Sequence, residues 1–264
     1  DFWMQNTPRS LDMIFVRGEG SRLWDQEGRD YIDFGSGVAV TSLGHTHPVL
    51  LKALTEQAGK LWHVSNYYTN EPALQLARKL CALTFAERVF YCNSGAEANE
   101  AALKLARKRA VDKHGPEKIE IVSFNGSFHG RTFFTVSVGG QAKYSSGMGP
   151  NPPGIVHIDL GDEAALRRVV GPKTCAIIVE PIVGESGEVP IDPASLKLMR
   201  ELASEFEPET AHVRCALFLQ HLRENVCGGN DELEAFVLNW LAFMVQKLTR
   251  KPGVALLLKG KGGQ

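Results

Sequence analysis

Residues 89–98 read VFYCNSGAEA, and this stretch decides the fold class. Its first four residues are aromatic, β-branched or otherwise apolar and predict a short strand, while residues 93–95 have the composition of a turn. Residues 96–108 are rich in alanine and other good helix formers, so we expect a helix to follow directly. A strand that passes through a short turn into a helix is typical of a layered α/β domain.

The same alternation continues toward the carboxyl end. Residues 119–124 and 175–179 are short, β-branched and nearly continuous in apolar residues, which is typical of buried strands in a parallel sheet. Residues 196–202 begin another helix. We therefore expect an α/β fold with a mostly parallel sheet, and such folds bind ligands at the carboxyl edge of the sheet.

The amino-terminal part of the chain has a different pattern. Residues 16–25 and 31–34 predict small antiparallel β-structure with glycine-containing turns. Apolar residues then recur at helical spacing over residues 50–61 and 74–81. An Asn-Glu-Pro sequence at residues 70–72 is a good start signal for the second of these helices.

The composition excludes some classes of function. The chain has 264 residues with 29 Lys and Arg against 30 Asp and Glu, so its net charge of −1 argues against a nucleic-acid-binding surface spread over the whole molecule. Apolar runs stay well below the roughly 18 residues that cross a bilayer, and the amino terminus has no signal-peptide pattern. The five cysteines are odd in number and widely spaced, which favours reduced thiols. We therefore expect a cytoplasmic protein without membrane or nucleic-acid partners.

Two segments follow predicted strands and have side chains that could bind a ligand. Ser94, Gly95 and Ala96 stand at a predicted helix start, where unpaired backbone N–H groups could hold a phosphate; an ordinary helix cap is the alternative. In the second segment, Phe128 could stack on a flat ring and Arg131 could grip a carboxylate. The alternative there is a core phenylalanine and a surface ion pair.

His45 and His47 have a spacing that could suggest a metal pair, but the sequence offers no third ligand. We predict a structural role for both histidines and no metal site.

Together these segments resemble the class III aminotransferases that depend on pyridoxal phosphate, in particular the acetylornithine and succinyldiaminopimelate aminotransferases. The agreement runs in order over about residues 16–204 and rests on many separate motifs. These are LWD at 23–25, YIDF at 31–34, LGHTHP at 43–48, LWHVSN at 61–66, YTNEPAL at 68–74, NSGAEANE at 93–100, FHGRT at 128–132, VSVGGQ at 136–141 and VEP at 179–181.

The resemblance implies a fold type I enzyme in which residues 94–96 cup the phosphate of pyridoxal 5'-phosphate and Phe128 stacks on its pyridine ring. It implies that Arg131 holds the substrate α-carboxylate and that Glu185 is a gating glutamate. Here Glu185 lies in Gly-Glu-Ser-Gly, whereas the family has Gly-Glu-Gly-Gly. The family reaction transfers the terminal amino group of N-acetylornithine or succinyldiaminopimelate to 2-oxoglutarate, in arginine and lysine biosynthesis, and the family enzymes are homodimers.

The sequence departs from the family after residue 204. The aspartate that pairs with the pyridine nitrogen and the Schiff-base lysine lie in segments of the family, of the types Phe-Asp-Glu-Val and Ser-x-x-Lys, that do not follow here. The remaining lysines, Lys247, Lys251, Lys259 and Lys261, have none of the family context. We therefore predict no catalytic residue of this kind and no turnover by this chain.

Residues 215–264 resemble a different family, the superfamily 3 helicases of phages and viruses. The resemblance is carried by FLQHLRENVCGGN at 218–230, LNWLA at 238–242 and KPGVAL at 251–256. The glycine-rich end then stops before the Gly-Lys pair of a nucleotide-binding loop. A shuffled helical tail is the alternative.

We interpret the chain as a fusion of two truncated pieces. Residues 1–48 correspond to part of the small aminotransferase domain, residues 49–205 to the first half of the large cofactor-binding domain, and residues 206–264 to a foreign, mainly helical tail. The strand near Val89 is expected to be left apart, because the family pairs it with late strands that are absent. Alternative functions are a defective helicase-derived nucleotidase module and a non-catalytic remnant.

Overall fold

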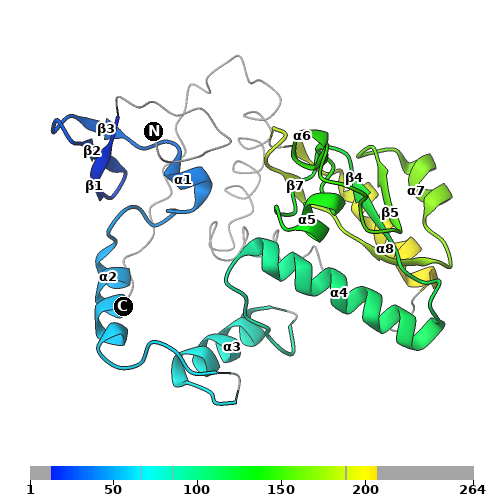
Figure 1. Ribbon diagram of the computed structural model, residues 1–264, viewed down its shortest axis with the longest axis horizontal. Coiled ribbons are helices and arrows are strands. Elements are labelled where there is room, and N and C mark those ends of the chain that lie inside the picture. The colour runs from blue at the N-terminus through cyan, green and yellow to red at the C-terminus, as the bar shows by residue number, and fades with distance from the viewer. Residues whose placement is uncertain (1–12, 66, 85, 188, 207–264) are drawn as a thin grey trace, which may run out of the picture. The chain divides into compact units, whose positions relative to one another are not determined.

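The computed structural model describes residues 13–65, 67–84, 86–187 and 189–206 (Figure 1). By their contacts, the described residues form two separate units that divide between Arg78 and Lys79 and are called unit 1 and unit 2. The domain boundary predicted near residue 48 stays a prediction. Residues 207–264 lie outside the described residues, so the foreign tail and its helicase resemblance also stay predictions.

Unit 1 begins with a small antiparallel sheet. Its strands are β1 (Phe15–Glu19), β2 (Arg22–Asp25) and β3 (Asp30–Ile32), in the order β1-β2-β3. The turn between β1 and β2 contains Gly20, whose φ of 57° is the left-handed conformation that glycine adopts without strain. The antiparallel β-structure predicted for this region is therefore confirmed.

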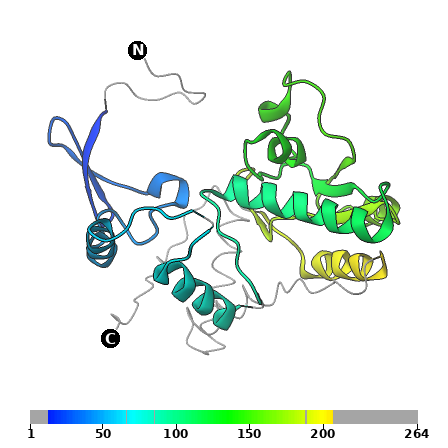
Figure 2. The ribbon, with the colours of Figure 1, turned by 60° about the horizontal axis from the view of Figure 1, so that its bottom comes forward.

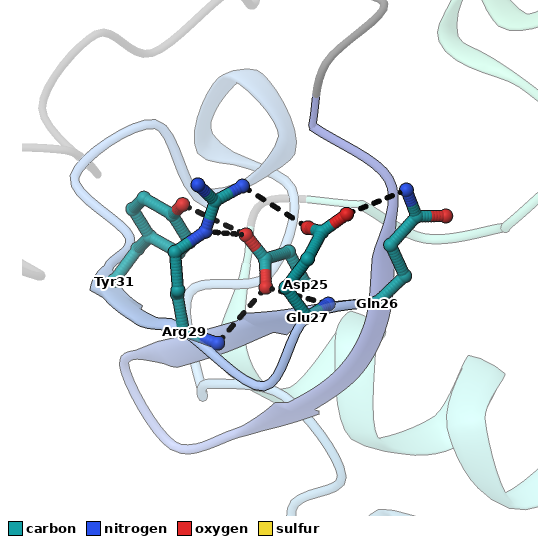
Figure 3. Close-up of polar contacts among 5 residues, drawn as sticks. All are labelled: Asp25, Gln26, Glu27, Arg29 and Tyr31. Carbon is teal, nitrogen blue, oxygen red and sulfur yellow. Dashed lines mark hydrogen bonds and ion pairs between the residues drawn. The ribbon is translucent and has the colours of Figure 1, made fainter.

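The carboxylate of Asp25 closes the turn between β2 and β3 (Figure 3). Its Oδ1 accepts hydrogen bonds from the backbone N–H groups of Glu27 at 3.1 Å and Arg29 at 2.9 Å. Its Oδ2 accepts from Arg29 Nε at 2.7 Å and from the Tyr31 hydroxyl at 2.8 Å. Burial alone would raise the pKa of Asp25, but the hydrogen bonds from Arg29 and Tyr31 outweigh it and lower the pKa from 3.8 to about 2.

Three helices follow: α1 (Ser36–Ala39), α2 (Pro48–Ala58) and α3 (Glu71–Leu83), of which α3 crosses the boundary between the units. The start predicted for α3 is confirmed, because Asn70 Oδ1 accepts a hydrogen bond from the backbone N–H of residue 73 at 3.0 Å. The helix predicted from the apolar spacing of residues 50–61 forms as α2, yet none of the residues of α2 is buried.

Unit 2 is built on a three-stranded parallel sheet. Its central strand is β4 (Glu120–Phe124), flanked by β5 (Ile155–Ile158) and β6 (Thr174–Ile177). The parallel pairing predicted for residues 119–124 and 175–179 is confirmed, although β6 ends two residues earlier. The sequence pattern does not predict β5.

Helices cover both faces of this sheet (Figure 2). Ile121 of β4 packs with Leu103 of α4 (Gly95–His114) and Val138 of α5 (Phe133–Val138). Alternate residues of β4 point to the other face and pack against α7 (Glu163–Val169) and α8 (Pro193–Phe206). The buried residues of this second core are Val122, Phe124, Ile158, Ala165, Leu166, Val170, Leu198, Met199 and Leu202. Unit 2 is therefore a three-layer α/β unit, which confirms the predicted α/β fold.

Three short elements complete the described part of unit 2. Helix α6 (Ala142–Ser145) follows α5, and β7 (Ile182–Val183) pairs with β8 (Val189–Pro190) as an antiparallel ribbon.

The strand predicted at residues 89–92 does not form. A strand needs a neighbour for its backbone groups, and the three-stranded sheet within the described ranges has the order β5-β4-β6 without this segment. Phe90 is 79% exposed. This agrees with the expectation that the segment would be left without strand partners.

Among the residues that the structure describes, none of the helices combines the length and the apolar composition of a bilayer-spanning segment.

Candidate active site

The start of α4 is a capped helix terminus with two backbone N–H groups that have no hydrogen-bond acceptor in the described residues. Ser94 is the N-cap, and its Oγ accepts a hydrogen bond from the backbone N–H of Glu97 at 3.2 Å. The Glu97 carboxylate in turn accepts from the backbone N–H of Asn93 at 2.6 Å, one residue before the N-cap, which is a variant of the capping box. The first two helical N–H groups, of Gly95 and Ala96, have no intrahelical acceptor and none elsewhere in the described residues. The helix cap formed by Ser94 therefore leaves these two N–H groups available, so capping and phosphate binding at this helix start do not exclude each other.

The loop after β4 packs directly on this helix start. Asn99 of α4 donates from Nδ2 to the backbone carbonyl of His129 at 2.8 Å. Thr132 donates from its hydroxyl to the carboxylate of Glu100 at 3.2 Å. These two contacts bracket Gly130, so the segment that holds Phe128 and Arg131 is fixed against the first two turns of α4.

Gly130 makes this close approach possible. A Cβ at this position would lie 2.6 Å from the Cβ of Ala96 and 2.8 Å from the hydroxyl of Thr135. Its φ of 123° is also a conformation that L-residues rarely adopt. Both the space and the backbone conformation require glycine.

Phe128 is half-buried, and its backbone N–H donates to Glu180 Oε1 at 2.7 Å. Glu180 belongs to the segment after β6, so this bond joins the carboxyl ends of β4 and β6. The ring of Phe128 contacts the ring of Tyr144 edge to face, with centroids 5.8 Å apart. Phe128 therefore lies where the sequence predicted a ligand-binding edge of the sheet.

Arg131 is exposed and stacks on the same tyrosine. Its guanidinium carbon lies 4.3 Å from the centroid of Tyr144 and 6.0 Å from that of Phe128. The surface ion pair considered as the alternative for Arg131 is not among the ion pairs of the described residues. The guanidinium therefore keeps its five N–H donors available for a carboxylate.

Glu185 reaches the same place from the segment between β7 and β8. Its carboxylate accepts from Lys143 Nζ at 3.2 and 3.3 Å and from the hydroxyl of Tyr144. The hydrogen bond from Tyr144 is the main cause that lowers the pKa of Glu185, and the bond to Glu185 raises the pKa of Lys143. Tyr144 thus contacts Phe128, Arg131 and Glu185, although sequence reasoning singled out neither Tyr144 nor Lys143.

A small cavity lies beside these residues and is lined by residues 127–130, Val136 and Tyr144, among others. His129 is 4% exposed, and its Nε2 has no hydrogen-bond partner in the described part of the chain. Burial lowers the pKa of His129 and so favours the neutral imidazole. A buried polar atom without a partner is unusual and marks a place where a ligand group could bind.

His45 of unit 1 has a hydrogen-bond partner within that unit. His45 Nε2 lies 2.7 Å from Asp33 Oδ2, and a hydrogen bond between them ties the loop after α1 to the end of β3. Within the described ranges, no group of three or more His, Cys, Asp or Glu side chains is arranged to hold a metal ion.

Residues 4–207 match the family model for aminotransferase class-III. An acetylornithine aminotransferase of Shewanella oneidensis is 63% identical over 192 residues, which cover 73% of this chain and 47% of the relative. A succinylornithine transaminase/acetylornithine aminotransferase of Pseudomonas aeruginosa is 62% identical over the same shares. The chain thus spans about half the length of the curated relatives it matches.

Solved structures agree with these matches. The ornithine aminotransferase of Toxoplasma gondii has a TM-score of 0.72 at 33% identity, and the match covers 78% of this chain and 49% of that chain. Another crystal structure of the same enzyme has partial occupancy of pyridoxal phosphate (PLP) at its active site. The N-acetylornithine aminotransferase of Stenotrophomonas maltophilia has a TM-score of 0.63 at 40% identity, covering 75% and 49%. By a family match over most of its length, this chain belongs to the class III aminotransferases.

Proposed function

We propose that unit 2 carries the phosphate-binding and carboxylate-binding part of a PLP-dependent transaminase site. The reaction would transfer the terminal amino group of N-acetylornithine, or of succinyldiaminopimelate, to 2-oxoglutarate. The observation that carries this proposal is the docking of Gly130 on Ala96, which joins the segment of Phe128 and Arg131 to the start of α4. Relatives named as acetylornithine aminotransferases support the choice of substrate class.

The residues present fit the cofactor. The free N–H groups of Gly95 and Ala96, at the positive end of a 20-residue helix, suit a phosphate dianion. Phe128 offers an aromatic face to the pyridine ring, and the unpartnered Nε2 of His129 is a polar group that a ligand could satisfy. When bound, pyridoxal phosphate supplies an electron-accepting ring that draws electrons from the substrate carbon bearing the amino group.

Arg131 and Glu185 are the proposed substrate-binding residues. The planar fork of Arg131 suits a carboxylate, which it can hold with two parallel hydrogen bonds. Glu185 is proposed as the gating glutamate, and its carboxylate is held by Lys143 and Tyr144. For the 264 residues taken by themselves, we propose reversible binding of PLP and no turnover, because none of the lysines after residue 204 has the family context.

The remaining family properties are proposals too. We propose that the protein is a homodimer located in the cytoplasm. Within each chain, we propose that residues 1–48 are part of the small domain and residues 49–205 are the first half of the large cofactor-binding domain. For residues 215–264 the motif resemblance to superfamily 3 helicases stays a hypothesis.

Substitution of Gly95 tests the phosphate site without disturbing the fold. A Cβ at Gly95 would have open space around it, with nothing outside its own helical turn within 4 Å, and an acidic residue in the first turn stabilises a helix by about 0.3–1 kcal/mol. Gly95→Asp is therefore expected to keep or raise the melting temperature while it weakens PLP binding at least about tenfold, because its carboxylate repels the phosphate dianion.

The neutral variant Gly95→Asn is the matched control, and pyridoxal without its phosphate is the matched ligand. Binding is measured by absorbance titration. Equal PLP affinity in the Gly95→Asp and Gly95→Asn variants would contradict the proposed phosphate site.

A further inference from the structure

Tyr144, on α6, lies between two opposite charges at the proposed substrate-binding end of the site. The face of its ring carries the Arg131 guanidinium, whose carbon lies 4.3 Å from the ring centroid. Its hydroxyl donates a hydrogen bond to the carboxylate of Glu185. One side chain thus contacts both the proposed carboxylate-binding cation and the proposed gating anion through different parts of its structure.

Two further contacts hold Glu185 in this place. Lys143 pairs with the Glu185 carboxylate through Nζ at 3.2 and 3.3 Å. The next residue along the chain, Ser186, donates from Oγ to the backbone carbonyl of Gly126 at 2.6 Å. The loop of Glu185 is therefore tied to the loop after β4 as well as to α6.

These contacts bear on which anions Arg131 is free to bind. A guanidinium is attracted to any unpaired carboxylate nearby, and a protein carboxylate that pairs with it competes with a carboxylate substrate. Glu185 already has two partners in Lys143 and Tyr144, and no carboxylate of the described residues is paired with Arg131. Arg131 and Glu185 are thus not paired with each other, although both contact the same tyrosine.

We propose that Tyr144 is a positioning residue with two separable actions: its ring face holds the Arg131 guanidinium, and its hydroxyl, with Lys143, keeps Glu185 from pairing with Arg131. The inference rests on the proposed function only in its consequence, namely that Arg131 then receives a substrate carboxylate. The two contacts themselves need no bound cofactor and can be tested on the chain alone.

The experiment compares Tyr144→Phe with Tyr144→Leu in the full 264-residue chain. Phenylalanine keeps the ring face and removes the hydroxyl, whereas leucine removes both. NMR measures two quantities in each variant: the upfield ring-current shift of the Arg131 side-chain protons and the pH midpoint of the Glu185 carboxyl carbon. Titration with 2-oxoglutarate, followed at the Arg131 signals, measures carboxylate affinity.

Tyr144→Phe is expected to keep the Arg131 ring-current shift and to raise the pH midpoint of Glu185 toward the ordinary glutamate pKa of 4.5. It is also expected to weaken 2-oxoglutarate binding by about two- to fivefold, which is the size expected for one exposed competing ion pair. Tyr144→Leu is expected to lose the ring-current shift as well. Lys143→Gln should raise the Glu185 midpoint and leave the shift unchanged. Lys197→Gln, which removes an exposed ion pair to Glu201 on α8, is the matched control and should change none of the three quantities.

A Glu185 midpoint that stays the same in Tyr144→Phe overturns the proposal, and so does an Arg131 shift that survives in Tyr144→Leu. If both signatures change as expected but 2-oxoglutarate fails to move the wild-type Arg131 signals, the positioning role is supported and the proposed carboxylate site is refuted. Far-UV circular dichroism identifies any variant that fails to fold, and Tyr144→Phe, which removes a single oxygen atom from a partly exposed side chain, then decides alone.

Discussion

The close approach of Gly130 to Ala96 predicts that Gly130→Ala separates the two halves of the site. The added Cβ would lie 2.6 Å from the Cβ of Ala96, whereas carbon atoms in contact are roughly 3.5–4.0 Å apart. The loop of residues 128–131 must therefore move away from α4 by about 1 Å or more. Such a movement would separate the ring of Phe128 from the phosphate-binding N–H groups.

The cost of this substitution has two parts. A non-glycine residue at a φ of 123° is strained by about 1–3 kcal/mol, and overpacking against α4 adds about 1–3 kcal/mol. The free energy of unfolding should therefore fall by about 2–6 kcal/mol. Gly147→Ala is the matched control, because Gly147 has a φ of 80° but a Cβ there meets nothing within 4 Å. It should show the strain alone, about 1–3 kcal/mol.

Hydrogen exchange of the amides in β4 and α4 measures the loss of stability in unit 2, and absorbance titration measures PLP affinity. Gly130→Ala should lose more stability than Gly147→Ala and should bind PLP at least about tenfold more weakly, since a displacement of this size costs about 1.4 kcal/mol or more of binding. Equal effects of the two variants on both stability and PLP affinity would refute the reasoning that Gly130 joins the loop to the helix.

Two further predictions concern stability. Because the pKa of Asp25 is lowered from 3.8 to about 2, the stabilisation that its ionised form gives the folded state is complete above about pH 4 and is lost as the pH falls through about 2. Thermal denaturation of the wild type and of Asp25→Asn across this pH range tests this prediction. Parallel curves of melting temperature against pH for the two proteins would contradict it. Leu166 is 2% exposed and lies in the core beneath β4, so Leu166→Ala should lower the free energy of unfolding by about 2–5 kcal/mol, as measured by urea denaturation. A loss below about 1 kcal/mol would show that this core is not close-packed.

The sequence predicted those parts of the fold that depend on local pattern. Residues 119–124 are short, rich in β-branched residues and nearly continuous in apolar residues, which is typical of a buried strand, and β4 is the centre of the sheet. The helix start at Asn93–Gly95 was equally predictable, because its Ser-Gly-Ala-Glu pattern satisfies the capping rules. Residues 89–92 have an equally good strand pattern but form none, since strand formation depends on neighbours that a local pattern does not contain.

The candidate site was predicted in its separate parts and not in its connections. Phe128 and Arg131 were identified from residue chemistry and family motifs. Their convergence on Tyr144 depends on α6, a helix of four residues too short to produce a periodic pattern. The bond from Tyr144 to Glu185 joins residues 41 positions apart in the chain, so only the folded loops bring them together. Long-range contacts of this kind leave no signal in a single sequence.

The most direct test of the central claim is an amide ¹H–¹⁵N correlation spectrum of the chain during titration with pyridoxal phosphate. The backbone N–H signals of Gly95 and Ala96 are predicted to shift saturably and more than any others in α4, because these N–H groups would donate to the phosphate. Pyridoxal without phosphate should leave them nearly unmoved. Saturable shifts elsewhere in the chain, with Gly95 and Ala96 unchanged, would contradict the claim that the start of α4 holds the cofactor phosphate.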